Sequence, residues 1–185
     1  RVQLARRALE LSADCADAYV VLAEESRSPD EARALYEKGV AAGERALGPQ
    51  VFAEEAGHFW GIVTTRPYMR ARFGLAESLE ALDRRDEAIE HYRELVRLNP
   101  GDNQGVRYSL LATLLLAGRD DAAATLLDQY GDEPTALWRY GRALSVFRRE
   151  GDSRAARERL REALRTNRHV PKLLAAEREW PGPEP

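Results

Sequence analysis

Two stretches of this chain repeat one pattern at a fixed spacing, and this repetition limits the folds open to it. The segment Leu82–Ala88 (LDRRDEA) recurs as Leu116–Ala122 (LAGRDDA), 34 residues further on. A period of 34 residues is typical of stacked helix-turn-helix units, because one pair of helices cannot bury its apolar face alone. The alternative is an ordinary helical bundle with chance spacing. The fixed period favours the repeat.

The stretch Arg66–Pro100 shows the repeating unit most completely. Its apolar residues recur at steps of three and four, which predicts two amphipathic helices on either side of the polar break Asp83–Asp86. Asp86 is expected to cap the second helix. Small Ala76 and Ala88 are expected where the paired helices approach closely. The remaining sequence has helical periodicity and few alternating runs, so we predict an all-α chain without strands.

This unit resembles the tetratricopeptide-repeat superfamily. The matching residues are Leu75, Ala76, Leu79, Ala88, Tyr92, Leu95 and Pro100. Arg72 stands where the superfamily usually has Trp. The resemblance extends over most of the chain and implies an α-solenoid of about three and a half to four helix pairs. It also implies a scaffold that binds proteins or peptides rather than an enzyme.

A narrower resemblance appears in the C-terminal half of the chain. Leu126–Asp132 and Asn167–Leu174 are similar to segments of the suppressor-of-tumorigenicity family, and the similarity covers residues 66–174. That family is described as membrane-associated and has no settled biochemical activity. The resemblance therefore implies a related fold without a mechanism, and this chain shows no membrane segment.

The repeat is interrupted once, at residues 49–65. We expect a short helix and a crossing segment there, with Phe59 and Trp60 largely buried and His58 at the rim of a concave surface. The chain also begins inside an apparent helix, Val2–Leu11, which reads as half of a pair. Residues 1–179 are predicted to form a single domain, and residues 180–185 a disordered tail or a cut linker.

Composition excludes several classes of function. The net charge is -3 and the pI about 5.8, which gives no bulk attraction to nucleic acid. The single Cys15 cannot form an internal disulfide, and no Cys/His cluster has metal-ligand spacing. No apolar run approaches the roughly 20 residues needed to span a bilayer. A cytoplasmic setting is expected, although the chain reads as a possible fragment that has lost its targeting signals.

No catalytic signature is present in the sequence. The three histidines, His58, His91 and His169, have no Cys, Ser or carboxylate at a spacing suited to catalysis or metal binding. Phosphate-binding loops and nucleophile elbows are absent from the sequence. We predict no enzyme activity and no cofactor, and we expect His91 to be a solvated surface residue.

The predicted binding surface lies along the first helices of the repeats. These helices line the concave face of a repeat stack. The residues predicted to contact a partner are Arg70, Phe73, Arg107, Tyr108, Trp138, Arg142 and His58. Guanidinium forks favour carboxylates, so the predicted partner is a protein or peptide of acidic character. The alternative is that these arginines are ordinary surface charges. The clamp that holds a peptide's C-terminus in some superfamily members is not reproduced, since Glu77 and Leu111 stand where its asparagines would be.

Two other functions stay open from the sequence. One is self-assembly, in which Val2, Leu4 and Leu9 on the first helix stack against a second copy or a neighbouring domain. The other is an accessory role in a larger enzyme or nucleic-acid machine.

Overall fold

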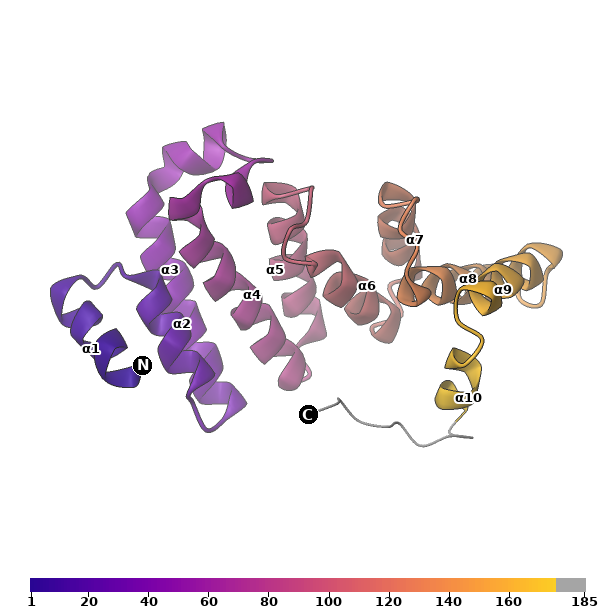
Figure 1. Cartoon of the computed structure of the whole chain (residues 1–185), viewed down its shortest axis with the longest axis horizontal. Helices are drawn as coiled ribbons and strands as arrows, with labels where there is room; N and C mark the ends of the chain where they lie inside the picture. The colour runs from indigo at the N-terminus through magenta and orange to yellow at the C-terminus, as the bar shows by residue number, and fades with distance from the viewer. Residues whose placement is uncertain (176–185) are drawn as a thin grey trace. The chain divides into compact units, whose positions relative to one another are not determined.

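The computed structural model of the chain describes residues 1–175, and all of its regular structure in that range is helical (Figure 1). The prediction of an all-α chain without strands is confirmed for residues 1–175. The α-helices are α1 (Val2–Leu11), α2 (Ala16–Glu24), α3 (Pro29–Glu54), α4 (Arg66–Ala81), α5 (Arg85–Leu98), α6 (Val106–Leu116), α7 (Asp120–Gln129), α8 (Ala136–Glu150), α9 (Arg154–Thr166) and α10 (Val170–Leu174). Two short 3-10 helices, η1 (Phe59–Gly61) and η2 (Val63–Thr65), precede α4.

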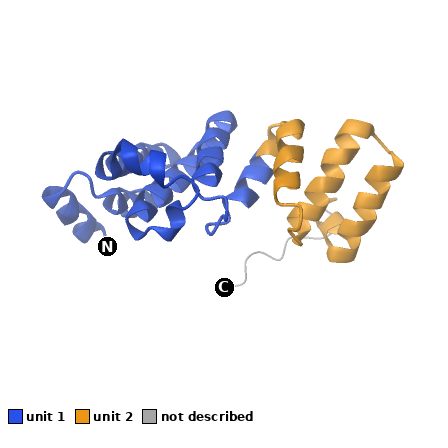
Figure 2. Cartoon of the chain, turned by 90° about the horizontal axis from the view of Figure 1, so that it is seen from above, with its two compact units in different colours: residues 1–113 blue, residues 114–185 orange. Residues whose placement is uncertain are grey.

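The chain divides into two compact units, residues 1–113 and 114–185 (Figure 2). The boundary falls inside α6. The single domain predicted for residues 1–179 stays a prediction. The predicted tail at residues 180–185 lies outside the described residues.

Two helices begin with a serine cap. The Ser28 hydroxyl accepts a hydrogen bond from the Glu31 amide at 3.3 Å, and Pro29 occupies the first turn of α3. Ser153 accepts from the Ala156 amide at 3.1 Å and starts α9 in the same way. These side chains satisfy amides that have no partner inside the helix.

The second helix of the central pair begins earlier than predicted. Arg84 rather than Asp86 is the N-cap of α5, and Asp86 lies in the first turn. Asp83 takes a positive φ of 60°, which turns the chain sharply enough for α5 to start at once. Asp86 and Glu87 still favour this end of the helix, because carboxylates are stabilised near a helix N-terminus.

The turn between α4 and α5 and the turn between α6 and α7 are 35 residues apart in the structure. The amides of Arg84 and Arg119 each donate to the carbonyl five residues before them, at 2.9 and 2.8 Å. The buried counterpart of Ala88 is therefore Ala123, and not Ala122 as the 34-residue motif predicts. The connection between α5 and α6 absorbs the additional residue.

Small residues allow α3 and α4 to pack closely. Gly43 lies against Tyr68, and a Cβ built at Gly43 would stand 2.8 Å from the Tyr68 Cβ and 3.1 Å from its Cα. Ala76 and Ala88 are fully buried, as a close helix crossing requires. The small residues predicted from the repeat pattern are thus part of the core of the first unit.

The interruption at residues 49–65 starts with a kink in α3. Gly48 has φ 73° and ψ 161°, and the helix resumes at Pro49 and continues to Glu54. This last part of α3 brings Phe52 to 5.2 Å from Phe59 and 4.9 Å from Tyr68, measured between ring centroids. The interruption is therefore a helical extension followed by two short turns, held by an aromatic cluster.

The two aromatic residues of the crossing segment differ in their burial. Phe59 is fully buried, as predicted, whereas Trp60 is half-buried. The Arg66 guanidinium lies over the Trp60 ring, 5.2 Å from its centroid, and Arg66 Nε donates to the Trp60 carbonyl at 2.9 Å. The Gly57 amide donates to the Leu98 carbonyl at 3.0 Å and ties the segment to the end of α5.

Candidate protein-binding surfaces

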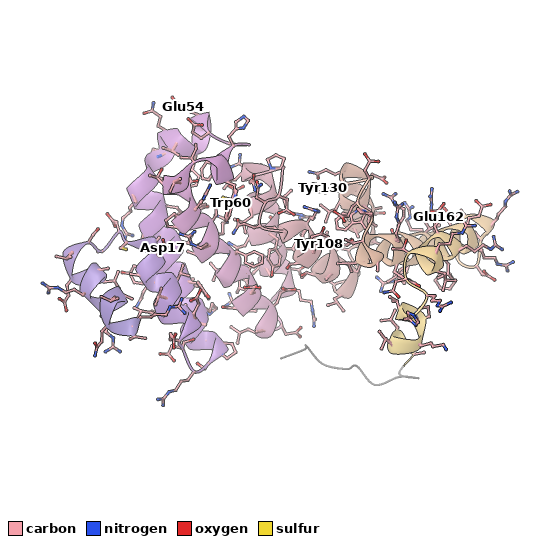
Figure 3. The ribbon with its side chains drawn as sticks, viewed as in Figure 1. Asp17, Glu54, Trp60, Tyr108, Tyr130 and Glu162 are labelled. Carbon is pink, nitrogen blue, oxygen red and sulfur yellow. The ribbon has the colours of Figure 1, made fainter. Side chains whose placement is uncertain are left out.

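Arg70, predicted to contact a partner, already holds a carboxylate of the first unit. Its guanidinium donates to both oxygens of Asp17 on α2, with the shortest distance 2.7 Å. Asp17 is labelled in Figure 3. Both side chains are partly exposed. An ion pair this exposed contributes little to stability, so a partner's carboxylate can replace Asp17 at small cost.

Arg107 has a structural role at the start of α6. Its guanidinium donates to Asp102 at 2.9 Å and lies over the ring of Tyr108, 4.5 Å from the centroid. The Asp102 side chain is 1% exposed and also accepts from the amides of Val106 and Arg107, at 2.7 and 3.0 Å. Asp102 thus caps α6, which starts at Val106.

Phe73 and His58 also lie in the first unit. Phe73 is half-buried and packs against Tyr92, with ring centroids 5.8 Å apart. His58 is exposed immediately before η1. The other histidine on this unit, His91, is not the solvated residue that the sequence predicts. It is half-buried, and burial followed by the Arg72 charge lowers its pKa.

Trp138, in the second unit, belongs to the core and not to a binding surface. It is 1% exposed, its indole donates to the Leu127 carbonyl at 3.3 Å, and its ring meets Tyr130 edge to face. Arg142, one turn further along α8, donates to Asp128 at 2.6 Å and to the Leu127 carbonyl. The prediction that Trp138 contacts a partner is therefore wrong, because the indole has no surface to offer.

A hollow in the first unit lies between the kinked end of α3, α4 and α5. It has a volume of about 480 Å³ and is lined by Glu44, Pro49, Phe52, Tyr68, Arg72, Glu94 and Arg97. Burial raises the pKa of Tyr68, and the hydrogen bond from Arg97 lowers the pKa of Glu94. Two arginines balance two glutamates, so the hollow has no net charge to attract an ion.

The second unit contains a larger and more apolar groove between α8, α9 and α10. Its volume is about 760 Å³. The side chains that form its walls are Leu137, Tyr140, Leu144 and Phe147 of α8, Ala156, Arg157 and Leu160 of α9, and Val170 and Leu174 of α10. We call this surface the end groove. Large exposed apolar patches on a protein mark sites of interaction.

The end groove corresponds to positions that the first unit buries. A shift of 68 residues, twice the repeat period, relates the two sets of positions. In the first unit, Met69, Ala76, Leu79 and Tyr92 are 0%, 0%, 2% and 0% exposed. Their counterparts in the second unit, Leu137, Leu144, Phe147 and Leu160, are 38%, 38%, 53% and 44% exposed. The end groove is thus a repeat face without a full covering helix in the described structure.

Basic residues are concentrated in the segment of the chain that contains the end groove. Residues 136–172 contain eleven Arg or Lys against four Asp or Glu, whereas residues 1–135 contain sixteen against twenty-four. Arg157, Arg161 and Arg165 follow one another at four-residue steps along α9, beside Leu160 and exposed. Arg157 donates to Asp152 at 2.7 Å. Arg161 and Arg165 have no ion pair within the described residues.

Two further classes of site are absent from residues 1–175. No group of three or more His, Cys, Asp or Glu side chains is placed to hold a metal ion there. None of the helices in this range has the length and apolar character needed to cross a membrane.

The sequence contains a signal for the end groove that the repeat pattern alone does not reveal. Leu144, Phe147 and Leu160 occupy repeat positions, so the pattern assigns them to the core. Only their place in the last complete pair, next to an arginine-rich helix, distinguishes them from core residues.

Comparison with known proteins supports the repeat assignment. Residues 69–102 match the sequence profile of the tetratricopeptide repeat. A solved structure described as YrrB, a TPR protein with an unusual peptide-binding site, is similar at a TM-score of 0.66 and 22% sequence identity, over 96% of this chain and 82% of that chain. No curated protein matches the sequence. The resemblance to the suppressor-of-tumorigenicity family is not shown by these comparisons and stays a prediction. The chain has the helix-pair fold of a tetratricopeptide-repeat protein.

Proposed function

We propose that this chain is a protein-interaction scaffold that binds a peptide or a protein and has no catalytic activity of its own. The open end groove of the second unit carries this proposal. Its walls are large apolar side chains that a soluble domain normally covers. The peptide-binding site named for YrrB is consistent with the same use of the fold.

We infer a second binding surface in the first unit, made by Arg70, Phe73 and Tyr108 of the set predicted along the first helices. The exposed pair between Arg70 and Asp17 can open for a partner's carboxylate, and Phe73 keeps part of its ring available. Binding through this surface is expected to weaken as the salt concentration rises, because salt screens the attraction between the Arg70 guanidinium and the partner's carboxylate.

Self-assembly is the main competing function. Leu4 and Leu11 on α1 are exposed, so this helix also has an uncovered apolar face. Stacking of α1 on another copy predicts a mass that rises with protein concentration. Binding to RNA that weakens with salt would instead favour a role in a nucleic-acid machine.

Capture of partners by the tagged full chain tests the proposal. Proteins cross-linked in a cell extract are identified for the wild type, for Leu160→Glu in the end groove and for Arg70→Glu in the first unit. The control is Leu4→Glu, which adds the same charge at an exposed apolar position of α1. A set of proteins lost only with Leu160→Glu or Arg70→Glu supports the proposal. Identical sets from all four chains contradict it.

A further inference from the structure

We propose that the end groove binds an amphipathic helix of another protein, with an acidic edge beside its apolar stripe. This inference rests on the proposed scaffold function and assigns its ligand class. Three observations lead to it: the spacing of the groove walls, the covering of the equivalent positions in the first unit, and the charge along α9.

The walls of the end groove have helical spacing. Leu137, Tyr140, Leu144 and Phe147 follow one another at steps of three, four and three along α8. Leu160 stands opposite them on α9. Small residues, Gly141, Ala143 and Ala156, lie between the two walls. Two ridges of large side chains with small residues between them form the surface into which the ridge of another helix packs.

The first unit shows what covers such a surface inside this chain. There, α6 lies against the pair formed by α4 and α5. The Thr113 hydroxyl of α6 donates to Glu80 of α4, and that carboxylate also accepts from the Tyr92 hydroxyl of α5 at 2.6 Å. Tyr92 is fully buried as a result, whereas its counterpart Leu160 is not. A helix is therefore the element that this face accommodates.

The charge beside the groove specifies the polar edge of that helix. Arg157, Arg161 and Arg165 lie one residue after Ala156, Leu160 and Leu164 on α9, so the basic row runs beside the apolar one. All four carboxylates of residues 136–172 are engaged already: Asp152, Glu158 and Glu162 with arginines, and Glu150 with the Ser153 hydroxyl. Carboxylates at four-residue steps on an incoming helix would complement this row.

The same charges disfavour a second copy of this chain as the occupant. The exposed face that it would offer is α1, which contains Arg6 and Arg7 against Glu10 alone, while Arg1 before it pairs with Glu24 at 3.0 Å. A helix with a basic excess would meet a basic row, and such contacts between like charges are unfavourable. An acidic helix from a different protein carries the opposite charge to this row, so its contacts with the arginines are favourable.

A synthetic helical peptide tests the inference with the full chain. The probe has Leu at positions i, i+3 and i+7 and Glu at four-residue steps along one edge, and carries a fluorophore for anisotropy. A second peptide replaces each Glu with Lys, and a third has the same composition in an order that breaks the Leu stripe. Each is titrated with the wild type and with Leu160→Glu and Arg161→Glu. Arg93→Glu is the matched control, because Arg93 precedes Arg161 by the same 68 residues.

We expect only the Glu peptide to bind the wild type. Leu160→Glu should weaken its binding at least about tenfold, and Arg161→Glu about fivefold at low salt with no difference at about 1 M salt, where exposed charges are screened. Arg93→Glu should bind like the wild type. Both replaced residues of α9 are exposed, so circular dichroism should confirm an unchanged fold.

Several results would overturn the inference. They are equal binding of the Glu and Lys peptides, binding of the Glu peptide that survives Leu160→Glu, and no binding at all. Trp180→Ala is titrated alongside, and binding that appears only with this variant would assign the groove to residues 176–185 of the chain itself. A dimer abolished by Leu160→Glu would assign it to a second copy. If the peptide fails while cellular partners are still lost with Leu160→Glu, the scaffold function stands and only the ligand class is wrong.

Discussion

Gly43 and Tyr68 lie in direct contact across the crossing of α3 and α4, with no room for a Cβ at Gly43. We predict that Gly43→Ala destabilises the chain by about 1–3 kcal/mol, because the added methyl group meets the Tyr68 backbone and not only a mobile ring. Gly61→Ala is the control, since nothing lies within 4 Å of its added Cβ. Urea unfolding of both variants measures the difference. Equal midpoints would show that the crossing can open at no cost.

Removal of the Asp102 carboxylate should destabilise the first unit. Asp102→Ala leaves the amides of Val106 and Arg107 without their cap and deprives a half-buried guanidinium of its partner. A lost cap costs about 0.5–2 kcal/mol, and a broken buried pair costs more. The exposed carboxylate of Glu90, which pairs with Arg93, provides the control, and Glu90→Ala should cost at most about 1 kcal/mol. Thermal melting of both variants tests whether Asp102→Ala lowers the melting temperature more than Glu90→Ala does.

The ion pair between Arg107 and Asp102 changes the expected result of reversing the charge at Arg107. From the sequence, charge reversal at Arg107 and Arg142 is expected to abolish the binding of an acidic partner and leave the fold intact. In the structure, Arg107→Glu would place a second carboxylate against Asp102, so a loss of stability is expected instead. Arg70→Glu is the better test of binding, because its pair with Asp17 is exposed.

Phe59 should contribute more to stability than Trp60. Phe59→Ala removes a fully buried ring from the cluster with Phe52 and Tyr68 and should cost about 3–5 kcal/mol. Trp60→Ala removes a half-buried ring and should cost about 1–2 kcal/mol. Chemical denaturation ranks the two variants. The reverse order would mean that Trp60, with Arg66, holds the crossing segment in place.

His91 should make stability dependent on pH just below neutrality. Burial lowers its pKa from about 6.5, so the folded chain binds this proton less tightly than the unfolded chain. As pH falls below about 6.5, the unfolded chain takes up the proton first and stability declines. His91→Gln should reduce the loss of stability between pH 7 and pH 5.5, as measured by urea midpoints, and His169→Gln, at an exposed position, should not. Burial raises the pKa of Glu77, which acts in the opposite direction but equally in all three chains.

The helices were predictable from sequence because their signals are local. Apolar steps of three and four have their expected effect in the structure. The caps Ser28 and Asp102 are local as well, because each accepts from an amide a few residues further along the chain. The small alanines of the central pair are buried for the same reason. Even here the buried counterpart of Ala88 is one residue later than the sequence motif predicts. The helical pattern on either side of a connection does not report the length of that connection.

The side-chain partners were not predictable, because they come from distant parts of the chain. Asp17, which holds Arg70, is 53 residues away from it in sequence. Trp138 follows Leu137 and Trp60 follows Phe59, so their sequence neighbours do not separate the two tryptophans, and only the packing of α7 and α8 decides that Trp138 is buried. The end groove is hidden in the repeat pattern because exposure depends on a covering helix, and a sequence position does not report whether that helix is present.

The hydrogen bond from the Gly57 amide to the Leu98 carbonyl affects how the first unit unfolds. In a plain repeat stack each pair contacts only its neighbours, so terminal pairs can open one at a time. Here the interruption joins the end of α3 to the end of α5. α4 cannot separate from α3 without breaking the cluster of Phe52, Phe59 and Tyr68, or from α5 without breaking the contact between Phe73 and Tyr92. We therefore expect the amides of α3, α4 and α5 to exchange with solvent deuterium in a single cooperative event, while those of α8 and α9 exchange earlier.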